Sequence, residues 1–277
     1  MKKFYFFLYL ILFFSITLTS QENPTKSCKG NLYFLWGYNR DYYSRSTIHF
    51  KNDGNPASDD VTGVYDFKVR NVEAHDRPQF EKIYDIKNIT IPQFSIRAGY
   101  YFNNSKDEGV EINYDHAKYI VDDWQTVRFE GRILNRDVNC DSMLNPSFFH
   151  FEHSDGANFW NFNYMRRWKL NKNSTGKHNF QIIAKGGAGF VLPRTDVTLF
   201  GKRVNNNWKI AGACVNLESG FRAEFWKRFV CEFTGKVLAV DYMSCLVQGK
   251  RNGKASQKFL ASELILTFGW QFGKTKP

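Results

Sequence analysis

LASELILTFGWQF, residues 260–272, is the stretch that decides the class of fold. Large apolar side chains stand on one side, at Leu260, Leu264, Leu266, Phe268, Trp270 and Phe272. The positions between them include Glu263, Thr267, Gly269 and Gln271. A period of two is that of a β-strand, whose successive side chains point to opposite faces. One apolar and one polar face are typical of a strand between lipid and a polar lumen. The sequence therefore predicts an all-β protein, an antiparallel transmembrane up-and-down β-barrel.

The start of the chain is typical of an exported protein. Lys2 and Lys3 precede an apolar run from Phe4 to Phe14, and small polar residues follow up to Ser20. The run is shorter than the roughly 20 residues that span a bilayer, so we expect a cleaved signal peptide rather than an anchoring helix. The expected division is 1–20 signal peptide, 21–30 leader, 31–273 barrel and 274–277 tail. The expected location is the outer membrane of a Gram-negative bacterium.

Several further segments alternate in the same way, and aromatic residues make up 17% of the chain. A secreted β-sandwich would also alternate, but its strands are mostly about five or six residues long, and several patterns here exceed ten. We count ten strands, with twelve as the alternative if residues 147–170 divide near Gly156. Two of the ten are residues 64–72 and 127–133. Short and long connections alternate, which places the start of the barrel in the periplasm.

Charged side chains on the predicted inner faces alternate in sign. A ten-strand lumen is narrow enough for side chains to fill nearly completely. One interpretation is a structural ion-pair network that plugs the barrel, and the other is a polar path for small solutes. The predicted lumen residues are Arg97, Glu111, Asp115, Arg128, Glu130, Arg132, Arg167, Glu218, Arg222, Glu232, Lys236 and Glu263, with Asp66, Lys68 and Arg70 also placed inward on the strand 64–72.

The formal net charge of +11 suggests an anionic partner. At a bacterial surface the nearest polyanion is lipopolysaccharide with its phosphates, and we expect no nucleic-acid partner. The basic residues expected in outer loops are Lys202, Arg203, Lys250, Arg251 and Lys254. Solvated loops without a partner are the alternative interpretation, because charged loops are common.

Cysteines and glycines point to no cofactor. The five cysteines, Cys28, Cys140, Cys214, Cys231 and Cys245, are an odd number and lack the spacing of a zinc site. The glycines at 186, 187 and 189 precede no helix pattern, so they are not a nucleotide fingerprint. We therefore expect neither a metal nor a cofactor.

The segment 148–158, FFHFEHSDGAN, contains the strongest candidates for catalytic residues: His150, Glu152, His153 and Ser154. A histidine base, an orienting carboxylate and a serine nucleophile are the components of acyl hydrolysis. The segment resembles the histidine-serine-asparagine-glycine motif of outer-membrane phospholipases and lipid A deacylases, which would imply lipid acyl hydrolysis. In those families a residue separates histidine from serine, whereas here the two are adjacent and point to opposite faces of a strand. Enzyme activity is therefore an alternative, and the polarity of the lumen explains the same residues.

A second resemblance spans most of the chain after the expected signal peptide. LYFLWGYNRDYYS (residues 32–44), FEHSDGANF (151–159) and the terminal aromatic strand are similar to a family of Bacteroidota outer-membrane barrels. That resemblance implies fold and location, including insertion by the general barrel-insertion machinery acting on the last strand. It brings no assigned activity and leaves the oligomeric state open. A structural or surface-binding role is the resulting interpretation.

Overall fold

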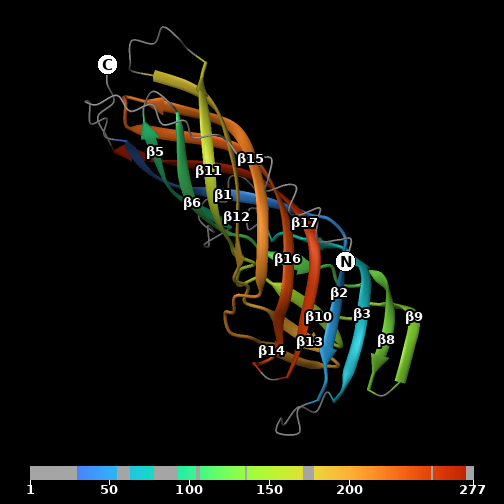
Figure 1. Ribbon diagram of the computed structural model, residues 1–277. Coiled ribbons are helices and arrows are strands. Elements are labelled where there is room, and N and C mark those ends of the chain that lie inside the picture. Colours follow the sequence, from blue (N-terminus) through green and yellow to red (C-terminus); the bar gives the residue numbers. More distant parts are fainter. Residues whose placement is uncertain are drawn as a thin grey trace, which may run out of the picture.

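Eight long strands close into a ring in the computed structural model, which describes residues 30–54, 63–77, 93–103, 107–134, 136–170, 178–250 and 252–272 (Figure 1). Every pair of neighbours in the ring is antiparallel. In order around the barrel the strands are β1 (Asn31–Tyr43), β5 (Phe94–Asn103), β6 (Glu108–His116), β11 (Phe159–Lys169), β12 (His178–Val191), β15 (Gly212–Phe225), β16 (Phe229–Gln248) and β17 (Asn252–Phe272). The part of the chain that the structure describes has no helix long and apolar enough to cross a membrane.

The first and last strands form the seam that closes this ring. β1 and β17 pair without interruption from Leu32 opposite Phe272 to Tyr43 opposite Ala261. The backbones approach closely at Gly269, where a Cβ atom would lie 1.9 Å from the carbonyl oxygen of Phe34. Only glycine fits such an approach, so the glycine on the polar face of the last strand has a structural role.

Nine shorter strands build an extension at one end of the barrel (Figure 1). They are β2 (Ser46–Asn52), β3 (Tyr65–Val72), β4 (Ala74–His75), β7 (Tyr119–Val121), β8 (Thr126–Ile133), β9 (Arg136–Met143), β10 (Phe149–His153), β13 (Asp196–Leu199) and β14 (Lys202–Asn205). One run of paired strands continues from β17 through β2, β3 and β8 to β9. The other leaves β1 and runs through β4, β7, β10 and β13 to β14.

Strand β17 passes through both the barrel and the extension. Its buried face is polar in the barrel and apolar in the extension, and its exposed face changes in the opposite sense. In the barrel its buried side chains include Glu263 and its exposed ones include Leu264. In the extension Phe259 is buried, whereas Lys254 is exposed. The inside of the extension is therefore an apolar core and its outside is polar, which is the arrangement of a protein surrounded by water.

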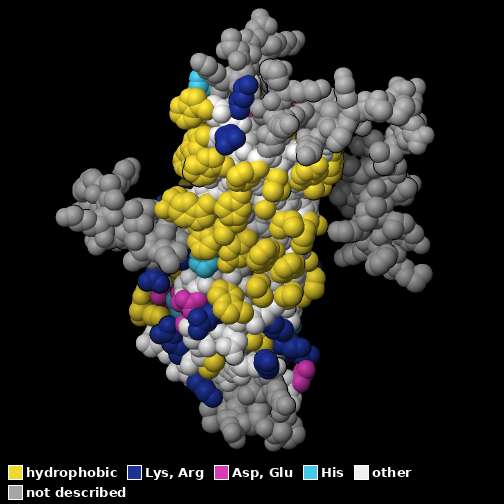
Figure 2. Space-filling view, turned by 90° about the vertical axis from the view of Figure 1, so that its left-hand side faces the viewer, with side chains coloured by type: hydrophobic (Ala, Val, Ile, Leu, Met, Phe, Trp, Pro, Cys, Tyr) yellow, Lys and Arg dark blue, Asp and Glu magenta, His cyan; other side chains and the backbone are white. Residues whose placement is uncertain are grey.

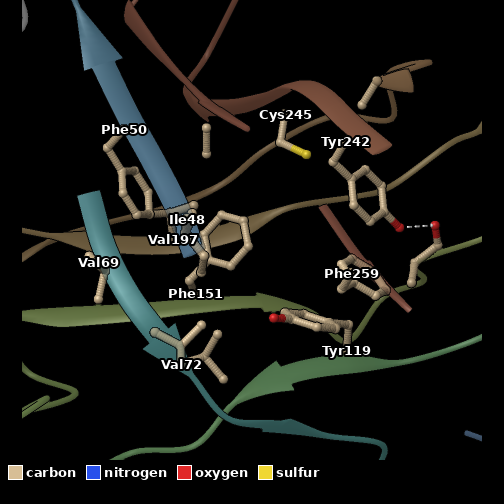
Figure 3. Packing of buried hydrophobic residues seen from close by; sticks show 14 of the residues in the cluster. Ile48, Phe50, Val69, Val72, Tyr119, Phe151, Val197, Tyr242, Cys245 and Phe259 are labelled. Atoms are coloured by element: carbon tan, nitrogen blue, oxygen red, sulfur yellow. Dashed lines mark hydrogen bonds between the residues drawn. The ribbon is translucent and has the colours of Figure 1, made fainter. Parts of the chain in front are cut away.

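The core of the extension combines aromatic rings with aliphatic side chains (Figure 3). Phe151, Tyr119, Tyr242 and Phe259 pack together, with the rings of Tyr119 and Phe259 stacked at 5.0 Å between centroids. The Tyr242 hydroxyl donates a hydrogen bond of 2.7 Å to the carbonyl oxygen of Ala157, which satisfies the polar group within the core.

The ring of eight strands corrects the prediction of ten. The segments 64–72 and 127–133 correspond to β3 and β8, and both lie in the extension. Their apolar side chains, such as Phe67 and Phe129, pack into the core between the two runs of strands rather than facing lipid. A strand whose apolar face is covered by protein shows the same alternation in sequence as a strand whose apolar face is covered by lipid. The predicted number of barrel strands was therefore too high. Without these two segments, the connections β5–β6, β11–β12 and β15–β16 fall at one end of the barrel, as the predicted alternation of short and long connections requires.

Candidate functional site

The outer surface of the ring carries a belt of apolar side chains (Figure 2). Lys and Arg side chains gather below it on the face shown. The belt includes Leu32, Phe34, Trp36, Tyr100, Phe102, Val110, Ile112, Phe162, Tyr164, Phe180, Val215, Leu217, Phe221, Phe233, Val237, Leu260, Leu264, Leu266, Phe268, Trp270 and Phe272. A closed ring also has no free backbone edge, because each strand pairs on both sides. These two properties define the class of the protein, a membrane-spanning β-barrel.

The inside of the barrel is filled by ion pairs. Lys185 Nζ lies 2.8 Å from carboxylate oxygens of Glu111 and Glu232, and 3.4 Å from one of Glu218. Arg97 Nη1 reaches Glu111 at 3.1 Å and Glu218 at 3.0 Å. The side chains of Lys185, Glu111, Glu218 and Arg97 have no solvent exposure. Such charges are stable away from water only when they are paired, so the members of this cluster neutralise one another inside the barrel.

The network continues towards both ends of the lumen. Arg222 contacts Glu232 at 2.6 Å and Glu224 at 3.1 Å, and Arg167 also contacts Glu224 at 3.1 Å. Their guanidinium groups lie over the rings of Tyr33 and Tyr101, an arrangement that adds cation–π attraction. In the other direction, Lys236 pairs with Asp115 and lies 3.4 Å from Glu263. Nine of the twelve predicted lumen residues take part in these contacts: Arg97, Glu111, Asp115, Arg167, Glu218, Arg222, Glu232, Lys236 and Glu263.

The other three predicted lumen residues, Arg128, Glu130 and Arg132, lie on β8, outside the barrel, and that placement was wrong. The same correction applies to Asp66, Lys68 and Arg70 on β3. All six belong to the water-facing side of the extension, where Arg70 pairs with Glu130 and Arg128 contacts Asp141 at 3.1 Å. Along β3 and β8 they alternate with side chains of the apolar core. The alternating charges therefore belong to the outer surface of the extension and not to a lumen.

The candidate hydrolase residues lie on β10 and the turn after it, also in the extension. Ser154 Oγ donates to Glu152 at 2.7 Å, and His150 lies between Glu152 at 3.3 Å and Asp123 at 2.8 Å. Hydrogen bonding to Glu152, then to Asp123, raises the pKa of His150 to about 9. At neutral pH this histidine is a cation between two carboxylates and does not act as a base towards the serine.

His153 points to the other face of β10. Its ring is fully buried in the aromatic core, with the ring of Tyr242 at a centroid distance of 5.0 Å. Burial lowers its pKa to about 3, so the ring is neutral. His150, Glu152, His153 and Ser154 therefore do not assemble as nucleophile, base and orienting acid.

A basic groove lies on the outer face of the extension, directly beside the apolar belt. One part of about 580 Å³ is lined by residues of β2, β3, β16, β17 and the connections next to them, and a neighbouring part of about 380 Å³ shares His49 and Ser256 with it. The basic side chains lining the two parts are Arg45, His49, Lys51, Lys68, Arg70, Lys250, Lys254 and Lys258. The lining carboxylates are Asp53 and Asp241.

The pairing of β2 with β17 sets two lysines of this groove against one another. Lys254 is the direct cross-strand partner of Lys51, two pairs along from Ser256 and His49 on the same face of the sheet. Like charges opposite one another on a sheet are destabilising. Lys51 has carboxylates of Asp53 and Asp66 at 3.2 and 3.9 Å, whereas Lys254 forms no ion pair with a described residue.

The predicted basic loop residues are divided between two places. Lys250 and Lys254 line the groove, although Lys254 belongs to β17 and not to a loop. Lys202 and Arg203 lie on β14, where Arg203 is held 2.7 Å from Asp196. Arg251 lies outside the described residues.

Sequence analysis missed His49 and Lys51 and assigned Lys68 and Arg70 to the lumen. The sequence before Leu260 does indicate a basic surface. Residues 254–259 (KASQKF) continue the period of two, with basic residues on the side of the strand that is apolar from Leu260 onward. Of the five cysteines, the four in the described residues are unpaired. The described residues contain no group of three or more His, Cys, Asp and Glu side chains placed to hold a metal ion.

Comparisons with known proteins give structural matches at low identity. Ail, the attachment invasion locus protein of Yersinia pestis, is 13% identical, with 88% of this chain and 99% of Ail covered and a TM-score of 0.30. Neisserial surface protein A (NspA) is 10% identical, with 84% and 96% covered and a TM-score of 0.27. The P. putida toluene transporter TodX is 9% identical, with 91% and 92% covered and a TM-score of 0.16. No family model and no curated protein matches the chain, so the resemblance to a Bacteroidota family stays a prediction.

Proposed function

We propose that this protein is an outer-membrane surface protein whose barrel is an anchor and whose extension binds the phosphate groups of lipopolysaccharide in the basic groove. The observation that carries the proposal is the position of the groove. The Lys258–Asp241 pair, with 2.7 Å between Nζ and Oδ2, lies two residues along β17 from the belt residue Leu260. The groove therefore begins where the apolar belt ends, at the height of lipid headgroups.

The charge of the groove suits a ligand with more than one phosphate. Its lining contains seven lysine and arginine side chains against two carboxylates. Lys68, Lys250 and Lys254 have no ion pair with a described residue, so their charges are available to a ligand. An anion between Lys51 and Lys254 would relieve the repulsion across β2 and β17.

The sealed lumen supports an anchoring role over the channel alternative. The ion pairs around Lys185 and Arg97 are fully buried and leave their charges engaged with one another. The hydrolase alternative has no support from the arrangement of Ser154, Glu152 and His150. We therefore expect purified protein to give no ion conductance in planar bilayers.

The test is binding of lipopolysaccharide to protein refolded in detergent, measured at several salt concentrations. We expect Lys51→Gln/Lys254→Gln to weaken binding about tenfold, since two exposed charge contacts together contribute about 1.4 kcal/mol. Lys227→Gln, in the exposed turn between β15 and β16 at the far end of the barrel, is the matched control and should bind as the native protein does.

Two results would contradict the proposal. One is equal binding by the double variant and the native protein. The other is unchanged affinity for lipopolysaccharide from which the phosphates have been removed, because binding would then depend on acyl chains or sugars.

A further inference from the structure

The charges inside the barrel do not balance. Among the described residues, its interior holds two more buried carboxylates than buried cations. The carboxylates are Asp41, Glu111, Asp115, Glu218, Glu224, Glu232 and Glu263, and the cations are Arg97, Arg167, Lys185, Arg222 and Lys236. Asp76, also buried and next to Asp41, is left out of this count because Arg40 neutralises it at 2.9 Å. An uncompensated buried charge is expensive, so a positive charge from outside the chain or a proton must neutralise the excess.

The excess is located at the seam. Asp41 on β1 and Glu263 on β17 are direct cross-strand partners, and both side chains point inward. Asp41 forms no ion pair with a described residue; its carboxylate accepts hydrogen bonds from Gln93 and Asn39. Among the described residues, Glu263 has only Lys236 as an ion-pair partner, at 3.4 Å, and it shares this lysine with Asp115. Two carboxylates opposite one another and buried repel strongly unless a cation lies between them.

A second observation at the same place points to a ligand. The amide of Asn39 is 2% exposed and turns its Nδ2 towards Asp41 at 3.3 Å, whereas its Oδ1 has no hydrogen-bond donor among the described residues. Both carboxylate oxygens of Glu263 likewise lack a hydrogen-bond donor there. Three oxygen atoms without a hydrogen-bond donor, one of Asn39 and two of Glu263, thus lie beside the Asp41 carboxylate, which has no ion-pair partner among the described residues.

We propose that Asp41, Glu263 and Asn39 bind one divalent cation of the Ca²⁺ type at the seam, where the barrel joins the extension. Binding requires the Asn39 amide to turn over, so that its Oδ1 replaces Nδ2 on the side of Asp41. The donors are all oxygen atoms, which suit Ca²⁺ and Mg²⁺ and not the metals that prefer nitrogen or sulfur. A charge of two also equals the excess of carboxylates. With only two carboxylates, water must complete the coordination, and Ca²⁺ accepts such irregular sets more readily than Mg²⁺ does. The site is independent of the groove and goes beyond the proposed function.

The bound cation would join the first strand to the last. Its removal leaves two facing negative charges on either side of the closing seam. Ca²⁺ therefore stabilises the closed barrel, and chelation weakens it.

The experiment uses the native chain refolded in detergent free of lipopolysaccharide, so that no lipid phosphate binds the metal. CaCl₂ is titrated calorimetrically, and the midpoint of heat denaturation is followed by gel migration in CaCl₂, MgCl₂ or EDTA. We expect one Ca²⁺ per chain and a higher midpoint in CaCl₂ than in EDTA.

The variant Asp41→Asn/Glu263→Gln should lose the heat of binding and the Ca²⁺-dependent rise, and in EDTA it should be more stable than the native protein. Asn39→Ala keeps both charges and should bind Ca²⁺ at least tenfold more weakly, which preserves the test if the double variant does not fold. The control Asp137→Asn, on the exposed strand β9, should behave like the native protein.

Three outcomes would overturn the proposal. The first is a midpoint that is the same in CaCl₂ and EDTA, with no heat of binding. The second is a Ca²⁺ effect that survives in the double variant, which would place the metal elsewhere. The third is stability that responds to pH alone, which would mean that protons neutralise the pair.

Discussion

Replacement of Lys185 by methionine tests whether the lumen is an ion-pair plug. The native ammonium group contacts Glu111 and Glu232 at 2.8 Å and Glu218 at 3.4 Å, with no exposure to solvent. In Lys185→Met the three carboxylates keep contacts to Arg97 or Arg222, but the buried cluster loses one positive charge. Removing one partner of a buried ion pair typically costs about 3–5 kcal/mol.

The expected loss is near the middle of that range, about 4 kcal/mol, because arginine contacts to all three carboxylates remain. Since 1.4 kcal/mol is tenfold, the unfolding equilibrium should shift roughly a thousandfold. The measurement is urea unfolding of the refolded protein in detergent, followed by tryptophan fluorescence. The control Lys169→Met removes a side chain that is 49% exposed and should change the free energy of unfolding by less than about 1 kcal/mol.

A second substitution separates charge from packing. In Lys185→Met/Glu111→Gln one of the three carboxylates that contacted Lys185 is also neutral, so we expect the double variant to recover about 1–3 kcal/mol of the lost stability. The reasoning is refuted if Lys185→Met lowers the free energy of unfolding no more than the exposed control does. It is also refuted if the double variant loses more stability than Lys185→Met and Glu111→Gln lose together.

Three further predictions concern the extension. The folded-state pKa of His150, about 9, lies above the ordinary 6.5, so its contribution to stability is complete below pH 6.5 and is lost as pH rises through 9. With its partial exposure the loss is about 2 kcal/mol, seen as a lower urea midpoint at pH 10 than at pH 6 that His150→Gln no longer shows. Phe151→Ala should destabilise the extension by about 3–5 kcal/mol, which limited proteolysis detects while gel migration still reports a folded barrel. A maleimide reagent should label the exposed Cys140 in the native protein and reach the buried Cys245 only after denaturation; equal labelling rates would refute the assigned burial.

The candidate sites differ in how far the sequence could predict them. The lumen residues on strands such as β5 and β15 were predictable, because strict alternation assigns Arg97 and Glu218 to the face opposite the belt. The groove was not predictable, because it depends on β2 pairing with both β17 and β3. Strand pairing between segments far apart in the chain has no counterpart in local sequence pattern, so Lys51, Lys254 and Lys68 could not be brought together in advance.

The sequence by itself determined the class of the protein and the character of its last strand. Alternation of apolar and polar residues over 260–272 is sufficient to predict a strand with two unlike faces, and the pairing of this strand with β1 shows that it closes the ring. Only the tertiary structure decided which alternating segments belong to that ring. Alternation shows that the two faces of a strand differ, but lipid and a second run of strands both cover an apolar face. Which of them covers Phe67 depends on the neighbours that β3 acquires in the folded chain, and so do the number of ring strands and the position of the basic groove.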